Sequence, residues 1–286
     1  MIAVITPVFN GANSIQKSIN SLLNQTYTNW VNIIVNDGST DGTHTILETL
    51  KDDYRFIIIH LDQNRGRGYA RNIALKKAKE IEAQYMCMLD ADDTYHPEKL
   101  LKQFNYMEKN KDLILSSCSI GVINKYGLYR IYEVSDKEKF YLSNTYEGIK
   151  IVPHASSIIR LISVDVQFDV NLKFAEDQDF MRRLLLGKKY SFAPKVLYYY
   201  NRDESFSISK YKKSLDANVN SFTKLNANPN FLKKMRLINT IKVIVFSFLV
   251  RIGLQKIYYN KIGRKPMNSE IEMYLSQKLI IDYDTK

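Results

Sequence analysis

Three acidic residues that follow an apolar run, Asp90, Asp92 and Asp93, constrain the fold of this chain more than any other feature. The apolar run Tyr85–Leu89 precedes them, and a helix-like stretch at 98–110 follows. This pattern predicts a buried strand that delivers carboxylates to its C-terminal end. Successive strand residues face opposite sides, so Asp90 and Asp92 can share a side while Asp93 starts the turn.

Closely spaced carboxylates repel one another unless a cation lies among them. Hard oxygen ligands suit Mg²⁺ or Mn²⁺, and these ions also bind phosphate oxygens. The acidic cluster therefore indicates a site for a metal ion and a diphosphate. An acidic surface turn is the alternative interpretation, and the surrounding motifs decide between the two.

The chain repeats a strand–loop–helix pattern three times before this motif. Strand-like runs at 2–6, 30–35 and 55–61 each lead into a loop rich in Gly, Asn, Asp, Ser or Pro. Helices are expected after them at 14–25, 46–50 and 70–82. Alternating strands and helices predict parallel βαβ units, whose loops emerge at the sheet edge where open α/β sheets bind ligands.

Beyond residue 111 the rhythm of the sequence changes. Further strands are expected at 113–123, 129–134, 151–161 and 196–200. A helix is expected from Glu176 until Gly187, because glycine commonly ends a helix. The whole pattern predicts an α/β fold.

The net charge of +11 is concentrated near the C-terminus. Residues 209–286 hold 15 Lys and Arg against 5 Asp and Glu, whereas residues 1–208 hold 26 against 25. This division predicts a nearly neutral domain at 1–208, with halves at 1–110 and 111–208. Residues 209–286 are expected to form a basic helical extension that meets an anionic partner.

Neither a targeting segment nor a cysteine framework is evident in the sequence. The chain opens directly with a strand-like run, without an apolar leader and small-residue cleavage site, so a cytoplasmic location is expected. Cys87 and Cys118 lie in apolar runs, which favours burial as reduced residues. No Cys or His spacing typical of a metal site appears.

Taken together, these motifs resemble those of glycosyltransferase family 2, the inverting enzymes of the GT-A fold. The matching segments keep the family's order over about residues 1–208. They are Thr6–Asn10, Asn36–Ser39, Asn64–Asn72, Asp90–Asp92, Glu176–Asp177 and the segment with Ser205 and Ser207. The resemblance implies a Rossmann-like, mostly parallel sheet flanked by helices, and transfer of a sugar from a nucleotide-diphosphate donor.

The resemblance also implies roles at the diphosphate. Asp92 is expected to ligate Mn²⁺ or Mg²⁺, and Asp90 to lie nearer the ribose or the sugar, with Ala91 between them in the motif. Arg67 and Arg71 would add positive charge at the diphosphate or the base. Solvated arginines at the start of a helix are the alternative.

The segments after the first two strands correspond to the nucleoside side of the family's site. Thr6 and Pro7 begin the first of these segments, and Phe9 matches the aromatic residue that packs on the base. Asp37 matches the residue that accepts the imide proton of uracil. The resemblance thus favours a UDP-sugar over a GDP-sugar, and a dTDP-sugar remains open because thymine has the same imide. A core phenylalanine and a structural turn aspartate are the alternatives.

On the acceptor side, Asp177 matches the family's general base, and Glu176 would orient hydroxyl groups of the acceptor or the sugar. An acidic first helical turn, favoured by the helix dipole, is the alternative for this pair. His154 lies where the family lines the acceptor side, although a core histidine fits equally well. Arg202 replaces a histidine of many relatives; it could close over the phosphates or be a plain surface residue.

The basic extension mixes apolar and cationic residues from 231 to 262. Its longest charge-free run, 243–250, is far shorter than the roughly 20 residues that span a bilayer. An amphipathic helix or hairpin on an anionic membrane surface is the favoured interpretation, which places the protein peripherally on the inner face of the plasma membrane. A helical subdomain or a homodimer interface is the alternative.

The favoured function is transfer to a glycan or lipid-linked acceptor in bacterial surface polysaccharide or lipopolysaccharide synthesis. A nucleotidyltransferase of related fold is the first alternative, although no glycine-rich signature with a basic end follows the first strand. A non-enzymatic binder of anionic polymers through the basic tail is the second. Nothing in the acidic loops serves nucleic-acid binding, so we expect no nucleic-acid partner.

Overall fold

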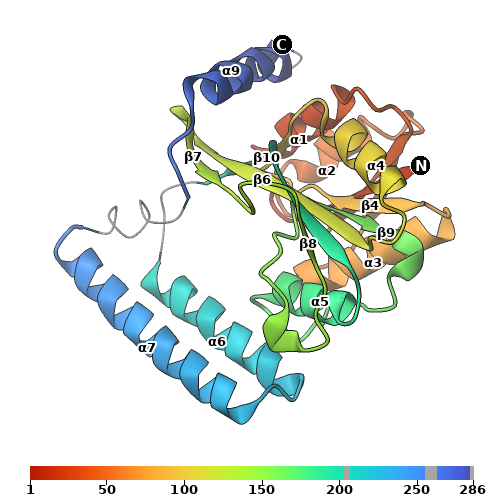
Figure 1. The fold of residues 1–286 in the computed structure, drawn as a ribbon. Helices are drawn as coiled ribbons and strands as arrows, with labels where there is room; N and C mark the ends of the chain where they lie inside the picture. The colour runs from red at the N-terminus through yellow and green to blue at the C-terminus, as the bar shows by residue number, and fades with distance from the viewer. Residues whose placement is uncertain (203–206, 255–262, 284–286) are drawn as a thin grey trace.

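The computed structural model describes residues 1–202, 207–254 and 263–283. Its centre is a ten-stranded sheet. The strands are β1 Ile2–Val8, β2 Trp30–Asn36, β3 Phe56–His60, β4 Tyr85–Met88, β5 Thr94–Tyr95, β6 Leu115–Asn124, β7 Gly127–Tyr132, β8 Lys139–Tyr141, β9 Ser157–Arg160 and β10 Tyr190–Asn201. Their order is β3-β2-β1-β4-β9-β6-β10-β5, with β7 paired to β6 and β8 to β10 (Figure 1).

Helices cover both faces of this sheet. Those described are α1 Ile15–Leu23, α2 Thr43–Glu48, α3 Arg67–Glu80, α4 Lys99–Lys109, α5 Glu176–Leu185, α6 Ile208–Lys224, α7 Pro229–Arg251 and α9 Asn268–Tyr283, with 3₁₀ turns η1 Tyr146–Gly148 and η2 Leu161–Ser163. A hydrophobic core lies on each face of the sheet, and the side chains of β1 join the two cores alternately, because neighbouring strand residues face opposite sides. Ala3 and Ile5 join the core under α3 and α5, while Ile2 and Val4 join the core under α1 and α4.

The expected α/β fold is confirmed. Strands β3, β2, β1 and β4 are parallel neighbours, so the loops after them meet at one edge of the sheet. Beyond β4 the sheet is mixed, since β9 runs antiparallel to both β4 and β6. Cys87 and Cys118 are buried and free, as expected from their apolar surroundings.

The limits of strands β9 and β10 differ from those predicted. The strand expected at 151–161 shortens to β9, because residues 154–157 form a turn closed by the Ser157 N–H on the His154 carbonyl at 3.1 Å. Strand β10 starts at Tyr190 rather than 196, and its register shifts where Pro194 lies between the paired residues Ala193 and Val196. Proline has no N–H for the ladder, so sequence periodicity stops there. The two short strands β5 and β8 carry no periodic signal and were not predicted.

The C-terminal helices attach to the body at two places. Helix α6 packs on α5 through buried polar contacts: Ser221 Oγ donates to Asp179 Oδ1 at 2.7 Å, and the Arg182 guanidinium bonds Ser221 Oγ and Asn218 Oδ1. Helix α7 lies against α6 on the side away from the sheet (Figure 1). Helix α9 returns to α1 and β7, where the Tyr274 ring lies 5.1 Å from that of Tyr199.

Two observations bear on the expected basic extension. Residues 255–262 of the stretch expected at 231–262 lie outside the described residues. Within the described ranges, none of the helices combines the length and the apolar character needed to cross a bilayer.

His96 joins the β5–α4 connection to α9. Its Nδ1 accepts the Glu98 N–H at 3.1 Å, so its Nε2 carries the proton and faces Met273 Sδ at 3.3 Å. Burial, together with the charge of Lys102, lowers the pKa of His96 to about 4. A histidine with a lowered folded-state pKa gains a proton on unfolding. Its contribution to stability is therefore present above pH 6.5 and is lost as the pH falls towards 4.

We predict that a change from pH 7 to pH 5 lowers the unfolding free energy of the wild type by about 2 kcal/mol more than that of His96→Asn. Asparagine keeps an acceptor for the Glu98 N–H and does not titrate. Urea unfolding at both pH values measures the difference. Equal losses in the two proteins would show that His96 does not carry this pH dependence.

Candidate active site

Hydrogen bonds tie together the loops that follow β1 and β2. The Asn10 N–H donates to Ser39 Oγ at 2.9 Å, and Asn10 Oδ1 accepts the Thr40 N–H at 2.8 Å. The Gly11 N–H donates to Thr43 Oγ1 at 2.9 Å. Because β1 and β2 are adjacent and parallel, these loops form one continuous wall.

The loop after β3 joins the same wall through Asp37. Both carboxylate oxygens of Asp37 accept backbone N–H groups, from Arg65 at 2.7 Å and from Gly66 at 2.8 Å. Gly38 has a φ of +69°, and a Cβ there would lie 2.4 Å from the backbone of Gln63. Only glycine permits that close approach. The Asp37–Gly38 pair therefore holds the third loop against the first two.

The acidic motif divides into two environments. Asp90 and Asp92 follow the end of β4 and line a cleft at this edge of the sheet. Asp93 is fully buried and accepts hydrogen bonds from Tyr198 Oη at 2.5 Å and from the Asn201 N–H at 2.8 Å. Burial, reinforced by the charges of Asp90 and Asp92, raises the pKa of Asp93 well above its ordinary value. Asp93 thus anchors β10 beneath the motif.

Arg71 of α3 connects the two halves of the site. Its guanidinium donates to Asp90 Oδ1 at 3.1 Å and to Glu176 Oε1 at 2.9 Å, while Arg67 Nε reaches the same Glu176 oxygen at 3.3 Å. Arg71 and Glu176 are each 3% exposed. Burial opposes the charge of Arg71, but the carboxylates of Asp90, Glu176 and Asp177 outweigh it and raise the pKa of the guanidinium.

The segment that leads into α5 is held by α3 and turns sharply at Ala175. The Asn72 side chain of α3 bonds both the N–H and the carbonyl of Phe168, at 2.8 and 2.9 Å. Ala175, the residue before α5, has a φ of 56°, a left-handed conformation that is unfavourable for a residue with a Cβ.

Arg71 Nε and Glu176 Oε2 are buried and have no hydrogen-bond partner among the described residues. Both polar atoms therefore remain available to a ligand or water.

The cleft has a volume of about 810 Å³. Eight of the predicted site residues line it: Pro7, Phe9, Asp37, Arg67, Asp90, Ala91, Asp92 and Glu176. Arg71 lies behind the wall and holds two of them. Phe9 is 48% exposed, so it is a surface of the cleft and not a core residue.

Besides Arg71, three predicted residues lie outside the cleft lining. Thr6 is buried in β1, where its Oγ1 accepts a hydrogen bond from Asn32 at 2.8 Å. Asp177 is half-buried beside the cleft, and its Oδ1 accepts the Gln178 N–H at 2.8 Å. Arg202 donates to Tyr132 Oη at 2.8 Å, on the β7 side of the sheet.

The two remaining predictions also have an outcome. His154 is 3% exposed and packs edge-on against Phe168 and Phe180, which supports the core interpretation. Burial, with a smaller effect of Arg71, lowers the pKa of His154 well below its ordinary value. In the last motif segment, Ser205 lies outside the described residues, and Ser207 is the N-cap of α6, where its side chain accepts the Lys210 N–H.

The sequence motifs missed part of the cleft. The unpredicted lining residues include Ser14, Val170, Leu172, Lys173 and Tyr200. Burial raises the pKa of Tyr200 to about 12, so its hydroxyl stays protonated and can donate a hydrogen bond. Residues 170–173 form a loop without periodicity, and long-range contacts of the preceding residues, such as that of Asn72 with Phe168, bring them to the cleft.

The side chains that line the cleft fit a hard divalent cation. Asp90 and Asp92 supply carboxylate oxygens on one wall, and one oxygen of Asp90 is already oriented by Arg71. No histidine or cysteine lines the cleft within the described ranges. Oxygen donors without nitrogen or sulfur favour Mg²⁺ or Mn²⁺ over zinc or copper.

Comparison with known proteins gives consistent matches. Residues 3–166 match the family model described as glycosyl transferase family 2. A putative teichuronic acid biosynthesis glycosyltransferase of Bacillus subtilis, TuaG, is 40% identical over 108 residues, which is 37% of this chain and 42% of that protein. An uncharacterized glycosyltransferase of Rickettsia typhi is 32% identical over 208 residues, 69% of this chain and 62% of its own length. The chain thus spans less than two thirds of each of these relatives.

Solved structures share the fold. The S. aureus TarS fragment 1–349 in complex with UDP has a TM-score of 0.63 at 23% identity, covering 82% of this chain and 69% of that one. The mannosyltransferase PcManGT of Pyrobaculum calidifontis, in complex with GDP-Man and Mn²⁺, has a TM-score of 0.61 at 14% identity, covering 99% and 84%. At this level of identity the likeness establishes the GT-A-like fold.

We predict that Arg71→Lys lowers the unfolding free energy by about 3 kcal/mol, because a single ammonium group cannot span Asp90 and Glu176 and leaves a buried carboxylate unpaired. Arg67→Lys is the matched control. Its side chain is 61% exposed, so its effect should stay within about 0.5 kcal/mol. Chemical denaturation measures both, and equal effects of the two substitutions would contradict a central role for Arg71.

Proposed function

Because the chain belongs to glycosyltransferase family 2, we propose that it is an inverting glycosyltransferase that moves a sugar from a UDP-sugar to a saccharide acceptor. The observation that supports this function most strongly is the pair of hydrogen bonds made by Arg71. It links Asp90 of the nucleotide-binding half to Glu176 of the acceptor half at one cleft. Donor and acceptor would meet there.

We propose that Asp92, with Asp90 beside it, holds the divalent cation Mn²⁺ or Mg²⁺. The bound ion would neutralise the charge of the leaving diphosphate. Arg67 lines the cleft and is 61% exposed, and its proposed role is to add a hydrogen bond to a phosphate oxygen. Arg71 is enclosed by two carboxylates, so its proposed role is to orient Asp90 and Glu176.

The preference for UDP depends on the nucleoside end of the cleft. Phe9 offers an exposed aromatic face, and Asp37, which accepts two backbone N–H groups, lines the same cleft. A carboxylate with further lone pairs can accept the imide proton of uracil or thymine. The TarS fold neighbour binds UDP and UDP-GlcNAc, which favours UDP, whereas PcManGT binds GDP-Man. We propose that the transferred sugar is a hexosyl or N-acetylhexosaminyl group.

Inversion requires a single displacement, with a base that takes the proton of the acceptor hydroxyl. We assign this role to Asp177, which lies half-buried at the start of α5 next to Glu176. Glu176 would orient sugar or acceptor hydroxyls through the oxygen that has no partner among the described residues. The proposed acceptor is a glycan or lipid-linked saccharide of the bacterial surface, in keeping with the teichuronic acid relative.

We propose further that residues 1–208 are the catalytic domain and that residues 209–286 place it on an anionic membrane surface from the cytoplasmic side. Helix α7 buries Asn239 and Phe246 against α6, and its opposite face exposes an apolar stripe. The stripe comprises Leu237, Ile238, Ile241, Ile244, Val245 and Phe248, all exposed.

Charge supports a lipid surface as the partner of this stripe. Helix α7 carries five cationic residues and no acidic one: Lys233, Lys234, Arg236, Lys242 and Arg251. Apolar side chains flanked by cations suit the interface of anionic lipids, to which each cation contributes on the order of 1 kcal/mol. A dimer that covers the stripe is the competing explanation.

Asp92→Asn is predicted to abolish transfer and to lower the Mn²⁺-dependent affinity for UDP at least about tenfold, since one carboxylate charge at the cation is lost. Calorimetric titration with UDP, with and without Mn²⁺, measures this. Asp136→Asn, at an exposed site far from the cleft, is the control that should bind as the wild type does. Unchanged metal-dependent binding in Asp92→Asn would exclude the assigned role.

Asp177→Asn should retain donor affinity yet reduce turnover by about 10² to 10⁴, the usual effect of removing a general base. Release of UDP in the presence of acceptor gives the turnover, and titration gives the affinity. A parallel loss of donor affinity would assign Asp177 to binding instead.

The full-length protein is predicted to sediment with anionic vesicles, not with neutral ones, and to be released by salt. Ile244→Asp, on the stripe, should weaken this binding more than Thr240→Asp, which adds the same charge off the stripe. A protein that stays in the supernatant with both lipids at low salt contradicts the membrane proposal. A stable dimer that Ile244→Asp disrupts would favour the competing explanation.

A further inference from the structure

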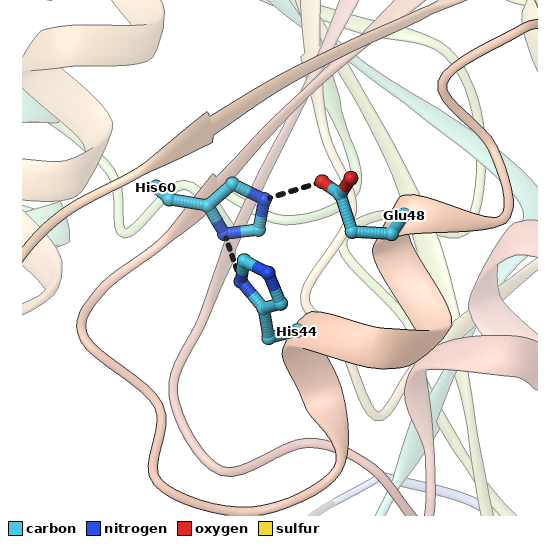
Figure 2. A group of neighbouring side chains, drawn as sticks. All are labelled: His44, Glu48 and His60. Atoms are coloured by element: carbon cyan, nitrogen blue, oxygen red, sulfur yellow. Dashed lines mark hydrogen bonds and ion pairs between the residues drawn. The ribbon is translucent and has the colours of Figure 1, made fainter.

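A second group of metal-type ligands lies outside the cleft. His44 and Glu48 belong to α2, four residues apart and therefore on one face of the helix, and His60 is the last residue of β3 (Figure 2). Ligand atoms of these three side chains lie within 4.8 Å of one another. Sequence spacing does not reveal the group, because His60 comes from a neighbouring element.

Hydrogen bonds around His60 define its proton positions. Asn36 Oδ1 accepts the Ser39 N–H at 3.1 Å, which directs the Asn36 amide nitrogen towards His60 Nδ1 at 3.0 Å. His60 Nδ1 must then be the acceptor. The ring proton is on Nε2, which lies 3.2 Å from Glu48 Oε1. A carboxylate behind a histidine fixes the ring and its tautomer in the way that supports metal ligation.

His44, the second histidine, faces the lone pair of His60 Nδ1. His44 Nδ1 lies 3.2 Å from His60 Nδ1, as Figure 2 shows. Two ring nitrogens that share a tetrahedral ion at 2.0–2.1 Å are about 3.3 Å apart. The existing separation therefore matches that of a chelating pair, and the Asn36 amide is the group that must release His60 Nδ1 when an ion binds.

Two arrangements of an ion can be compared at this group. The pair His60 Nε2 and Glu48 Oε1 is also 3.2 Å apart, but it uses the opposite nitrogen of His60. An ion there would place the ring proton on Nδ1, facing the amide N–H of Asn36. Two donors would then oppose each other, and the ion would have one imidazole ligand in place of two. The Nδ1 pair is therefore favoured for a transition metal ion.

We propose that His44 and His60 bind a divalent transition metal ion through their Nδ1 atoms, with Glu48 holding the His60 ring in place. Imidazole nitrogen favours Zn²⁺, Cu²⁺ or Ni²⁺ over Mg²⁺ and Mn²⁺, so this site differs in chemistry from the carboxylate pair in the cleft. His44 is exposed, which leaves water to complete the coordination. The ion takes the Nδ1 lone pair to which the Asn36 amide now donates, so the Asn36 side chain must shift away from His60 when the ion binds.

The direct test is calorimetric titration of the untagged full-length protein with Zn²⁺ in a buffer that contains excess Mg²⁺. One Zn²⁺ should bind per chain. His44→Gln and His60→Gln should each abolish saturable binding, and Glu48→Gln should weaken it about 10-fold to 100-fold. Asp92→Asn, in the cleft, should bind Zn²⁺ as the wild type does, so this result is independent of the glycosyltransferase proposal.

A spectroscopic measurement on the wild type avoids any dependence on the folding of variants. One equivalent of Cu²⁺ should give an electron paramagnetic resonance spectrum with hyperfine coupling to two imidazole nitrogens. The proposal is overturned if Zn²⁺ shows no saturable binding, if His44→Gln and His60→Gln bind it unchanged, or if the Cu²⁺ spectrum shows no nitrogen coupling.

Discussion

The buried guanidinium of Arg71 is the contact on which the arrangement of the cleft depends. It joins α3 to Asp90 in the turn after β4 and to Glu176 at the start of α5, residues 86 positions apart along the chain. A buried charge without a partner destabilises a protein by several kcal/mol, so the three groups hold one another in place. The two halves of the protein therefore meet with fixed geometry at the point where donor and acceptor would react.

Sheet topology supplies the remaining wall of the cleft. The parallel neighbours β3, β2, β1 and β4 end at one edge, where Asp37 collects the backbone N–H groups of Arg65 and Gly66. Asp93 provides the corresponding anchor on the other side, beneath Asp90 and Asp92, by binding Tyr198 and the backbone of Asn201. Carboxylates thus have two separate tasks here: the buried ones fix loops and strands, and the accessible ones face the cleft.

Much of this could be predicted from the sequence because local signals agree with the fold. The spacing of apolar residues and the composition of the loops predicted β1 to β4 with their helices. The apolar run before Asp90 predicted a strand that ends at the acidic residues. What escaped prediction depends on partners distant in the sequence. The orientation of Asp93 is set by Tyr198, the core position of His154 by Phe168 and Phe180, and the encounter of His44 with His60 by the pairing of β2 and β3. Pro194 hid the first half of β10 by interrupting its periodicity.

The proposed function requires that the cleft bind a nucleotide-diphosphate sugar through a divalent cation. Calorimetric titration of the full-length protein with UDP-, dTDP- and GDP-sugars, in Mn²⁺ and again in EDTA, tests it most directly. We predict binding of a UDP-sugar that requires Mn²⁺ and weaker binding of every GDP-sugar. Absence of binding by all nucleotide sugars in Mn²⁺, or tighter binding of a GDP-sugar, would contradict it.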